Sequence, residues 1–397
     1  MGRDRLGFIE SIRGLAALVV CLAHYFSTFL PAASQAFMPG DTQDNFPVHL
    51  PLVETMLRQT PFSIMFNGQF AVCLFFVLSG FALSIGYFQR GDRVALAAGA
   101  LKRYPRLVLP IAASLLLGTL LYYFACFSAR QVAAITGSAW LAVQYDPARS
   151  PGVLVLNALN GILTMSSGKL NPVLWTMKVE FAGSLLVFGF WANVGRARWR
   201  WPMAAMVAVL AIVFWRFGAL NSLFTVSVLC GSFIARFCVS GRLLPLPASA
   251  LITLGLFCGC LNYTGMFGGW LPPTAIFGVR LLDVLNIAGS ILVVLGVAAS
   301  PAWRTVLDKP WLRWLGRLSF PLYLVHFPLF SSVGTGIFLV AQPLGYASAC
   351  WLAFIGWASA TFVTAGIFAR LADEPAQQAA RHFSSMVLAR LNKTAQA

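Results

Sequence analysis

The chain has 397 residues, of which 59% are hydrophobic and only 10% are charged. Soluble domains carry about 25% charged residues, so this composition excludes a water-soluble protein and leaves no room for a sizeable soluble domain. The formal net charge of +16 does not indicate nucleic-acid binding, because the basic residues lie in short gaps between apolar runs, where the positive-inside rule places them.

The apolar runs predict an all-α fold, a polytopic membrane helical bundle. Each run is continuous and about 20 residues long, so it spans a bilayer as a helix whose backbone bonds internally. In chain order, ten transmembrane helices are expected near residues 14–31, 68–88, 107–127, 171–194, 202–219, 220–237, 247–263, 279–300, 316–339 and 346–370. The transmembrane domain then covers residues 1–371, and residues 372–397 form a tail.

An even number of spans places both termini on the same side of the membrane. With these spans, 21 of the 28 Lys and Arg residues fall on that side, 6 fall on the other, and Lys178 lies within a helix. This asymmetry predicts that both termini and the tail are cytoplasmic. Nine or eleven spans would put the tail outside and weaken the bias.

Two long loops, at about residues 32–67 and 128–170, lie on the opposite side. Loops of this length are often functional, and these are candidates for a cap over an outward-facing cavity. Residues 153–165 are apolar but too short to span, which favours an interfacial or re-entrant helix. The eight cysteines fall almost entirely within apolar runs and predict small buried side chains, with no metal site and no disulfide framework.

Arg13 and His24 lie on the first predicted helix, and ionisable residues at membrane depth are functional candidates. They are 11 residues apart, which is three helical turns and roughly 16 Å along one stripe. This spacing suits an extended donor with its diphosphate at Arg13 and its thioester at His24. The alternative is that Arg13 is one more inner charge and His24 packs through a hydrogen bond.

Arg103 and Arg106 precede the third predicted helix and are three residues apart, so they can face the same way. Arginine forks match phosphate oxygens, so the pair is a candidate binding site for a phosphorylated donor. The alternative is that both are topology signals alone.

Glu180 lies in the fourth predicted helix, for which Asn171 and Pro172 are expected to provide the N-cap and the first helical position. It is a candidate cavity-lining residue or distant base, and the alternative is an ion pair with another helix. Trp175 is placed in the interfacial belt. Lys178 can snorkel outward and is about 200° from Glu180, so the two are poor partners for each other.

Tyr323 and His326 are three residues apart on the ninth predicted helix and share a face. Pro321 and Pro328 flank them and interrupt the backbone ladder, so free carbonyls are expected there to bind polar groups or to allow a bend. The alternative is a kinked helix with a hydrogen-bonded histidine.

Taken together, these residues resemble the acyltransferase 3 family of integral-membrane acyltransferases over nearly the whole chain. Six phrases match in the family's order: Glu10-Ser11-Ile12-Arg13 through His24, Phe75 to Phe81, Arg103 with Arg106, Leu174-Trp175 with Glu180, Ser319 to Pro328, and Asp373-Glu374-Pro375. Three positions depart from the family pattern: Glu10 stands where Asp is more usual, Phe320 replaces a Tyr, and Lys178 is atypical. A relay to a second, hydrolase-like domain on this chain is not expected.

The resemblance implies transfer of an acyl group, often acetyl, from cytoplasmic acyl-CoA to a hydroxyl of a cell-surface or lipid-linked saccharide, at a bacterial cytoplasmic membrane. His24 is expected to act as general base, with Glu180 and His326 as further catalytic candidates. Arg13, Arg103 and Arg106 are expected to bind the donor. Trp175, Lys178 and Tyr323 are expected to contact the acceptor.

Two other functions fit parts of the sequence. A proton-coupled transporter or flippase would use the membrane histidines and Glu180 as a relay, but it needs neither the paired arginines nor a slot of this length. A second alternative is acylation of a cytoplasmic small molecule such as a macrolide.

Overall fold

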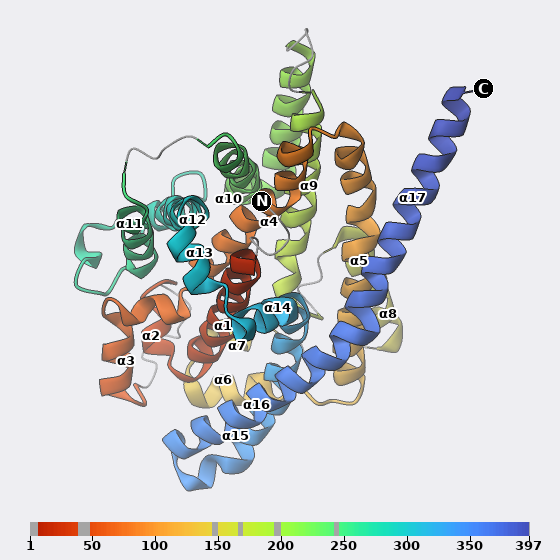
Figure 1. Ribbon diagram of the computed structural model, residues 1–397. Helices are drawn as coiled ribbons and strands as arrows, with labels where there is room; N and C mark the ends of the chain where they lie inside the picture. Colours follow the sequence, from red (N-terminus) through yellow and green to blue (C-terminus); the bar gives the residue numbers. More distant parts are fainter. Residues whose placement is uncertain are drawn as a thin grey trace.

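A computed structural model describes residues 7–38, 48–144, 150–165, 170–193, 200–241 and 246–396. The described chain is a helical bundle without a named β-strand (Figure 1). Its longer helices are α1 (Gly7–Phe29), α4 (Gly68–Arg90), α5 (Arg93–Tyr123), α9 (Trp175–Asn193), α10 (Arg200–Val239), α12 (Leu281–Ala299), α14 (Pro310–Leu329), α16 (Tyr346–Phe368) and α17 (Glu374–Gln396).

Shorter elements connect these helices. The α-helices are α2 (Pro31–Ser34), α3 (Pro51–Arg58), α6 (Ala129–Thr136), α7 (Ala139–Ala142), α8 (Pro151–Thr164), α11 (Ala248–Cys260), α13 (Pro301–Leu307) and α15 (Thr335–Ala341). The 3-10 turns are η2 (Phe62–Phe66), η3 (Pro172–Leu174), η4 (Gly268–Trp270) and η6 (Gln342–Leu344), and the π-helical turns are η5 (Phe330–Gly334) and η7 (Ala369–Asp373).

Eight helical stretches in the described part of the chain are long and apolar enough to cross a membrane. They correspond to eight of the ten predicted spans. The predicted span at 247–263 is α11, whose 13 residues fall short of that length. The predicted spans at 202–219 and 220–237 both lie in α10, which consists of two helical segments joined at a kink. The kink is at Gly218, whose φ of 83° is a conformation that favours glycine.

Helix α5 begins at Arg93, well before the predicted start at 107. The Asp92 side chain caps it by accepting a hydrogen bond from the backbone of Val94 at 2.8 Å, directly after Gly91 ends α4 in a left-handed conformation. Arg103 and Arg106 therefore lie on a helix and not in a loop. The residues predicted as a tail form α17, which continues α16 through η7 and runs beside α5 (Figure 1).

Helices α1 and α14 pack together through two glycines. A Cβ built on Gly316 would lie 2.1 Å from the carbonyl oxygen of Glu10, and one on Gly14 would lie 2.8 Å from the Gly316 nitrogen. Such close approach of small residues is a common way for helices to associate in a membrane. His24 is ten residues after Gly14, and His326 is ten residues after Gly316. The contact therefore puts the two histidines at matching heights, about 15 Å along each helix.

Gly316→Ala is expected to destabilise the folded protein, because the added methyl group has no space against Glu10. Overpacking of this kind costs about 1–3 kcal/mol, and sometimes more. The matched control is Gly189→Ala on α9, where a Cβ would meet nothing within 4 Å. Thermal stability in detergent, followed as loss of the monodisperse size-exclusion peak, measures both. Equal midpoints for the two variants would contradict the close α1–α14 contact.

The carbonyl of Leu324 on α14 is free of its helical partner because that partner is Pro328, which has no N–H. It accepts hydrogen bonds from Asn171 Nδ2 at 2.8 Å and from Ser114 Oγ at 2.9 Å. Asn171 also caps the next turn, as predicted, by accepting from the backbone of Val173. The carbonyl that Pro328 leaves free thus joins α14 to Ser114 of α5 and to Asn171, just before α9. The polar groups that were expected at such a carbonyl are therefore side chains of the protein.

Candidate active site

The two predicted helix histidines contact each other. Nδ1 of His24, on α1, lies 2.9 Å from Nε2 of His326, on α14. Nδ1 of His326 lies 2.7 Å from the carbonyl oxygen of Tyr323 and 3.2 Å from that of Leu322. His326 is fully buried, whereas His24 is half-buried and lines a cavity.

The partners of His326 assign the proton on each ring of the neutral pair. Carbonyl oxygens only accept hydrogen bonds, so Nδ1 of His326 carries a proton and its Nε2 is an acceptor. Nδ1 of His24 therefore donates to that Nε2. The remaining nitrogen of His24, Nε2, holds a lone pair and can take a proton. Two backbone carbonyls and one buried histidine thus orient His24 as a base.

Trp140, on the short helix α7, covers His24. The two rings lie 5.2 Å apart and nearly parallel, at 10°. Ser138 caps α7 and donates a hydrogen bond from its Oγ to the carbonyl of Ser27, at 2.7 Å, which fixes the loop to α1 one turn beyond His24. Sequence reasoning missed Trp140; the capping pattern of Gly137 and Ser138 indicates a short helix there, but not what that helix covers.

The cavity at His24, here called the histidine cavity, has a volume of about 1430 Å³ with its open mouth. Both long loops contribute to it, Phe37 and Met38 from the first and Trp140 from the second, in agreement with the cap predicted for them. Its remaining wall combines aromatic rings with amide and hydroxyl side chains and one guanidinium, that of Arg280; the others include Ser27, Gln69, Trp175, Asn221, Phe224 and Asn286. A polar ligand with flat apolar faces suits such a wall.

A second cavity, here called the arginine cavity, has a volume of about 830 Å³ with its open mouth and is lined by Arg13, Arg103 and Arg106. Arg103 forms an ion pair with Glu180 of α9. The Nε atoms of Arg13 and Arg103 are buried without a hydrogen-bond partner in the described structure. Apolar side chains complete the wall, including Val72, Phe75, Phe76, Leu83 and Leu107.

Arg106 is held by the end of α16. It forms an ion pair with Asp373 of η7, whose other carboxylate oxygen accepts from Gln377 at 3.0 Å. The Arg106 guanidinium also lies 5.5 Å from the ring centre of Phe320. Asp373 was not among the predicted site residues, although it belongs to the closing phrase of the family resemblance. Phe320 replaces the expected tyrosine with a ring that still faces an arginine.

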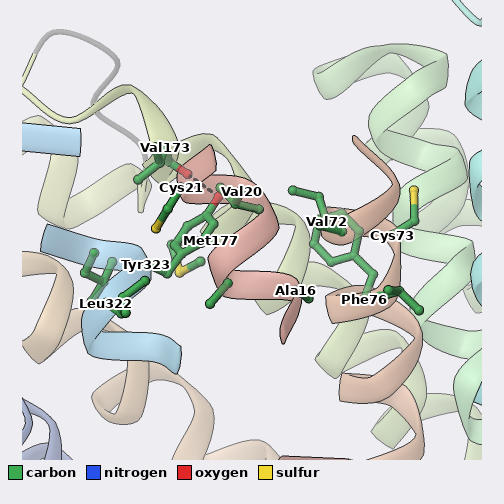
Figure 2. Close-up of a cluster of buried hydrophobic side chains, with 14 of the residues drawn as sticks. Ala16, Val20, Cys21, Val72, Cys73, Phe76, Val173, Met177, Leu322 and Tyr323 are labelled. Atoms are coloured by element: carbon green, nitrogen blue, oxygen red, sulfur yellow. Dashed lines mark hydrogen bonds between the residues drawn. The ribbon is translucent and has the colours of Figure 1, made fainter. Parts of the chain in front are cut away.

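The two cavities share Val72 and Tyr323 in their walls. Figure 2 shows Val72 and Phe76 on α4, Val20 on α1 and Tyr323 on α14 in one cluster. The Tyr323 hydroxyl donates to the carbonyl of Val173 at 3.1 Å, drawn as a dashed line, and lies 3.0 Å from the hydroxyl of Thr176. Tyr323 is therefore held by hydrogen bonds where the arginine-lined and histidine-lined spaces meet.

The structure thus divides the predicted residues into two groups. His24 and His326 form one, and Trp175 lines the same cavity; Arg13, Arg103, Arg106 and Glu180 form the other. Glu180 was predicted as a catalytic candidate, but it pairs with Arg103 and lines only the arginine cavity, as the ion-pair alternative described. Lys178 is half-buried and lines neither of the two cavities, and its contact with the acceptor stays a prediction.

Comparison with known proteins identifies the family. Residues 6–369 match the family model of the Acyl_transf_3 acyltransferase domain. Searches of curated proteins and of solved structures gave no match. The matched range contains His24, His326 and the three arginines of the arginine cavity, and it covers nearly the whole chain. The chain therefore belongs to the acyltransferase 3 family of membrane acyltransferases.

Proposed function

We propose that this membrane acyltransferase moves an acetyl group from acetyl-CoA to a hydroxyl of a cell-surface or lipid-linked saccharide at a bacterial cytoplasmic membrane. The observation that carries the proposal is the meeting of two unlike cavities at Val72 and Tyr323. One has three arginines, which suit the phosphates of a donor. The other has His24, oriented as a base, beside aromatic and amide groups.

The arginine cavity fits the diphosphate and pantetheine portions of CoA. The buried Nε groups of Arg13 and Arg103 have no partner in the described protein, and such groups are costly unless a ligand or water satisfies them. Phe75 and Phe76 offer apolar contact to the pantetheine chain. Arg13 and His24 are 11 residues apart on one helix, roughly 16 Å, which suits the distance from diphosphate to thioester.

The histidine cavity fits a sugar. Sugar rings present apolar faces that pack on aromatic side chains, and Trp140 and Trp175 both line this cavity. Sugar hydroxyls need donors and acceptors, which the amides of Gln69 and Asn286 provide.

The proposed reaction is a direct transfer. The acceptor hydroxyl oxygen attacks the thioester carbonyl carbon while Nε2 of His24 takes the hydroxyl proton. The new C–O bond forms, the C–S bond breaks, and the CoA thiolate leaves with the proton returned from His24. His326 holds His24 in the required tautomer throughout, in the way a carboxylate does in a hydrolase triad. The products are an acetyl ester and the free thiol of CoA.

The test is a transfer assay with purified protein in detergent. Radiolabelled acetyl-CoA and lipid-linked oligosaccharide should yield labelled glycan and an equal amount of free CoA. Acetylation of a macrolide in place of the glycan would overturn the acceptor assignment. Proton-coupled flux in liposomes without any acyl transfer to a glycan would overturn the enzymatic proposal.

Orientation in the membrane gives a separate prediction. Because 21 of 28 basic residues fall on the side of the predicted termini, we expect the arginine cavity to open to the cytoplasm, where acetyl-CoA is made. A fluorescent reporter fused after Ala397 should be active, and the same reporter within residues 32–67 should be inactive. The reverse pattern would contradict the proposed path of the donor.

A further inference from the structure

A third cavity adjoins the arginine cavity and is not used by the reaction proposed above. This open groove has a volume of about 2000 Å³ and is lined by residues of α1, α5, α14, α16, η7 and the first turn of α17. It shares Arg13, Arg106, Ser319 and Phe320 with the arginine cavity. The two spaces are therefore adjacent, which leaves room for a ligand longer than the arginine cavity to extend into the groove.

Two further arginines line this groove, Arg317 on α14 and Arg370 on η7. Both are exposed, and neither forms an ion pair with a carboxylate in the described part of the chain. Arg317 is three residues before Phe320, and Arg370 is three residues before Asp373, so each lies one turn from a residue that holds Arg106. Positive charge thus extends from the arginine cavity along the groove.

Carboxylates in the groove do not cancel this charge. Asp373 is already paired with Arg106. Glu10 and Glu374 also line the groove and are exposed, as Arg317 and Arg370 are, so solvent screens both signs of charge alike. The four arginines that line the groove outnumber its three carboxylates. Arg317 and Arg370 therefore remain available to phosphate oxygens, which guanidinium groups bind in a fork.

Aromatic rings lie in the same groove. Trp314, one turn before Arg317, and Phe362 on α16 have ring centres 6.2 Å apart and are nearly parallel, at 11°. Trp314 is 49% exposed, although it is a large apolar side chain. Exposed aromatic faces beside cations are how proteins bind nucleotide bases without base pairing.

We infer that this groove binds the nucleotide end of CoA, with Arg317 and Arg370 on its 3′-phosphate and Trp314 and Phe362 against its adenine. The inference rests on the proposed use of acetyl-CoA. The arginine cavity accounts for the diphosphate and pantetheine; the 3′-phosphate and the adenine then lie outside it. The adjoining groove supplies two arginines that form no ion pair in the described part of the chain, and the exposed ring of Trp314 beside Phe362.

The experiment compares acetyl-CoA with acetyl-3′-dephospho-CoA. Wild-type protein should have a KM for acetyl-CoA about tenfold or more below that for the dephospho form, because charge-assisted hydrogen bonds are lost with the phosphate. The double variant Arg317→Gln with Arg370→Gln should raise the KM for acetyl-CoA to the dephospho value and leave the dephospho KM and kcat unchanged. Trp314→Ala should raise the KM for both donors. Arg381→Gln, an exposed arginine on α17 that does not line the groove, is the control and should change neither.

Binding of adenosine 3′,5′-bisphosphate, measured by calorimetry, gives a readout that needs no catalysis. The Arg317/Arg370 double variant should lose it, and Arg381→Gln should keep it. Equal discrimination between the two donors in wild type and double variant would overturn the inference while leaving the proposed function intact. Loss of bound anionic phospholipid from the double variant, with donor discrimination unchanged, would assign the groove to lipid. Absence of any CoA binding to wild type would instead overturn the proposed function.

Discussion

Replacing His24 with glutamine is expected to lower kcat for acetyl transfer by about 10²–10⁴-fold, the usual contribution of a positioned general base. The amide can hydrogen-bond to His326 and fill the same space, but it cannot accept the hydroxyl proton. Binding of acetyl-CoA should be unchanged, because the arginine cavity is not lined by His24. Calorimetric binding of CoA and single-turnover transfer of radiolabelled acetyl measure the two effects separately.

The same assay tests the part played by His326. His326→Leu removes the acceptor for the His24 Nδ1 proton, so kcat should fall by a large part of the factor that His24→Gln costs. His326→Gln can place a carbonyl oxygen at that position and should retain more activity than the leucine variant. Because the two histidines act as a unit, His24→Gln with His326→Leu should be no slower than His24→Gln alone. If His24→Gln transfers acetyl at the wild-type rate, His24 is a packing residue and the general base lies outside this pair of histidines.

Replacing Arg103 with alanine is expected to raise the KM for acetyl-CoA by about tenfold or more, because a charge-assisted contact with phosphate is lost. The change should shrink at high salt, since the phosphate contact is screened. The double variant Arg103→Ala with Arg106→Ala should have a still higher KM for acetyl-CoA. Kinetics at several salt concentrations, on protein that elutes as a single folded species, measure the effect.

Glu180→Gln is the matched control for Arg103→Ala. It breaks the same ion pair from the other side but leaves all three arginines in the arginine cavity, so donor binding should be kept or strengthened. We expect kcat to stay within a few-fold of wild type, because Glu180 does not line the histidine cavity. Complete loss of turnover in Glu180→Gln, with acetyl-CoA still bound, would instead make Glu180 a catalytic group. An unchanged affinity for CoA in Arg103→Ala with Arg106→Ala would make both arginines topology signals only.

The sequence by itself determined that the chain lies in a membrane, that its fold is all-α, and where most of the helices lie. Backbone polar groups in lipid must bond internally, so a continuous apolar run of sufficient length has only the helix available to it. Local features then placed several boundaries: Asn171 caps the turn before α9 as predicted, and a break falls at Gly218 between two expected spans. The α1 helix runs without interruption through Arg13 and His24, which kept their predicted spacing.

Only the tertiary structure decided which helix faces meet. His24 and His326 are 302 residues apart, and the predicted periodicity assigned each to a face without assigning a partner. The same holds for the pairing of Glu180 with Arg103 and for Trp140 over His24. Lipid chains are as apolar as the side chains they surround, so hydrophobic pattern does not select helix neighbours in a membrane. Close contacts such as Gly14 against Gly316 make that selection, and they form only when two distant segments fit each other.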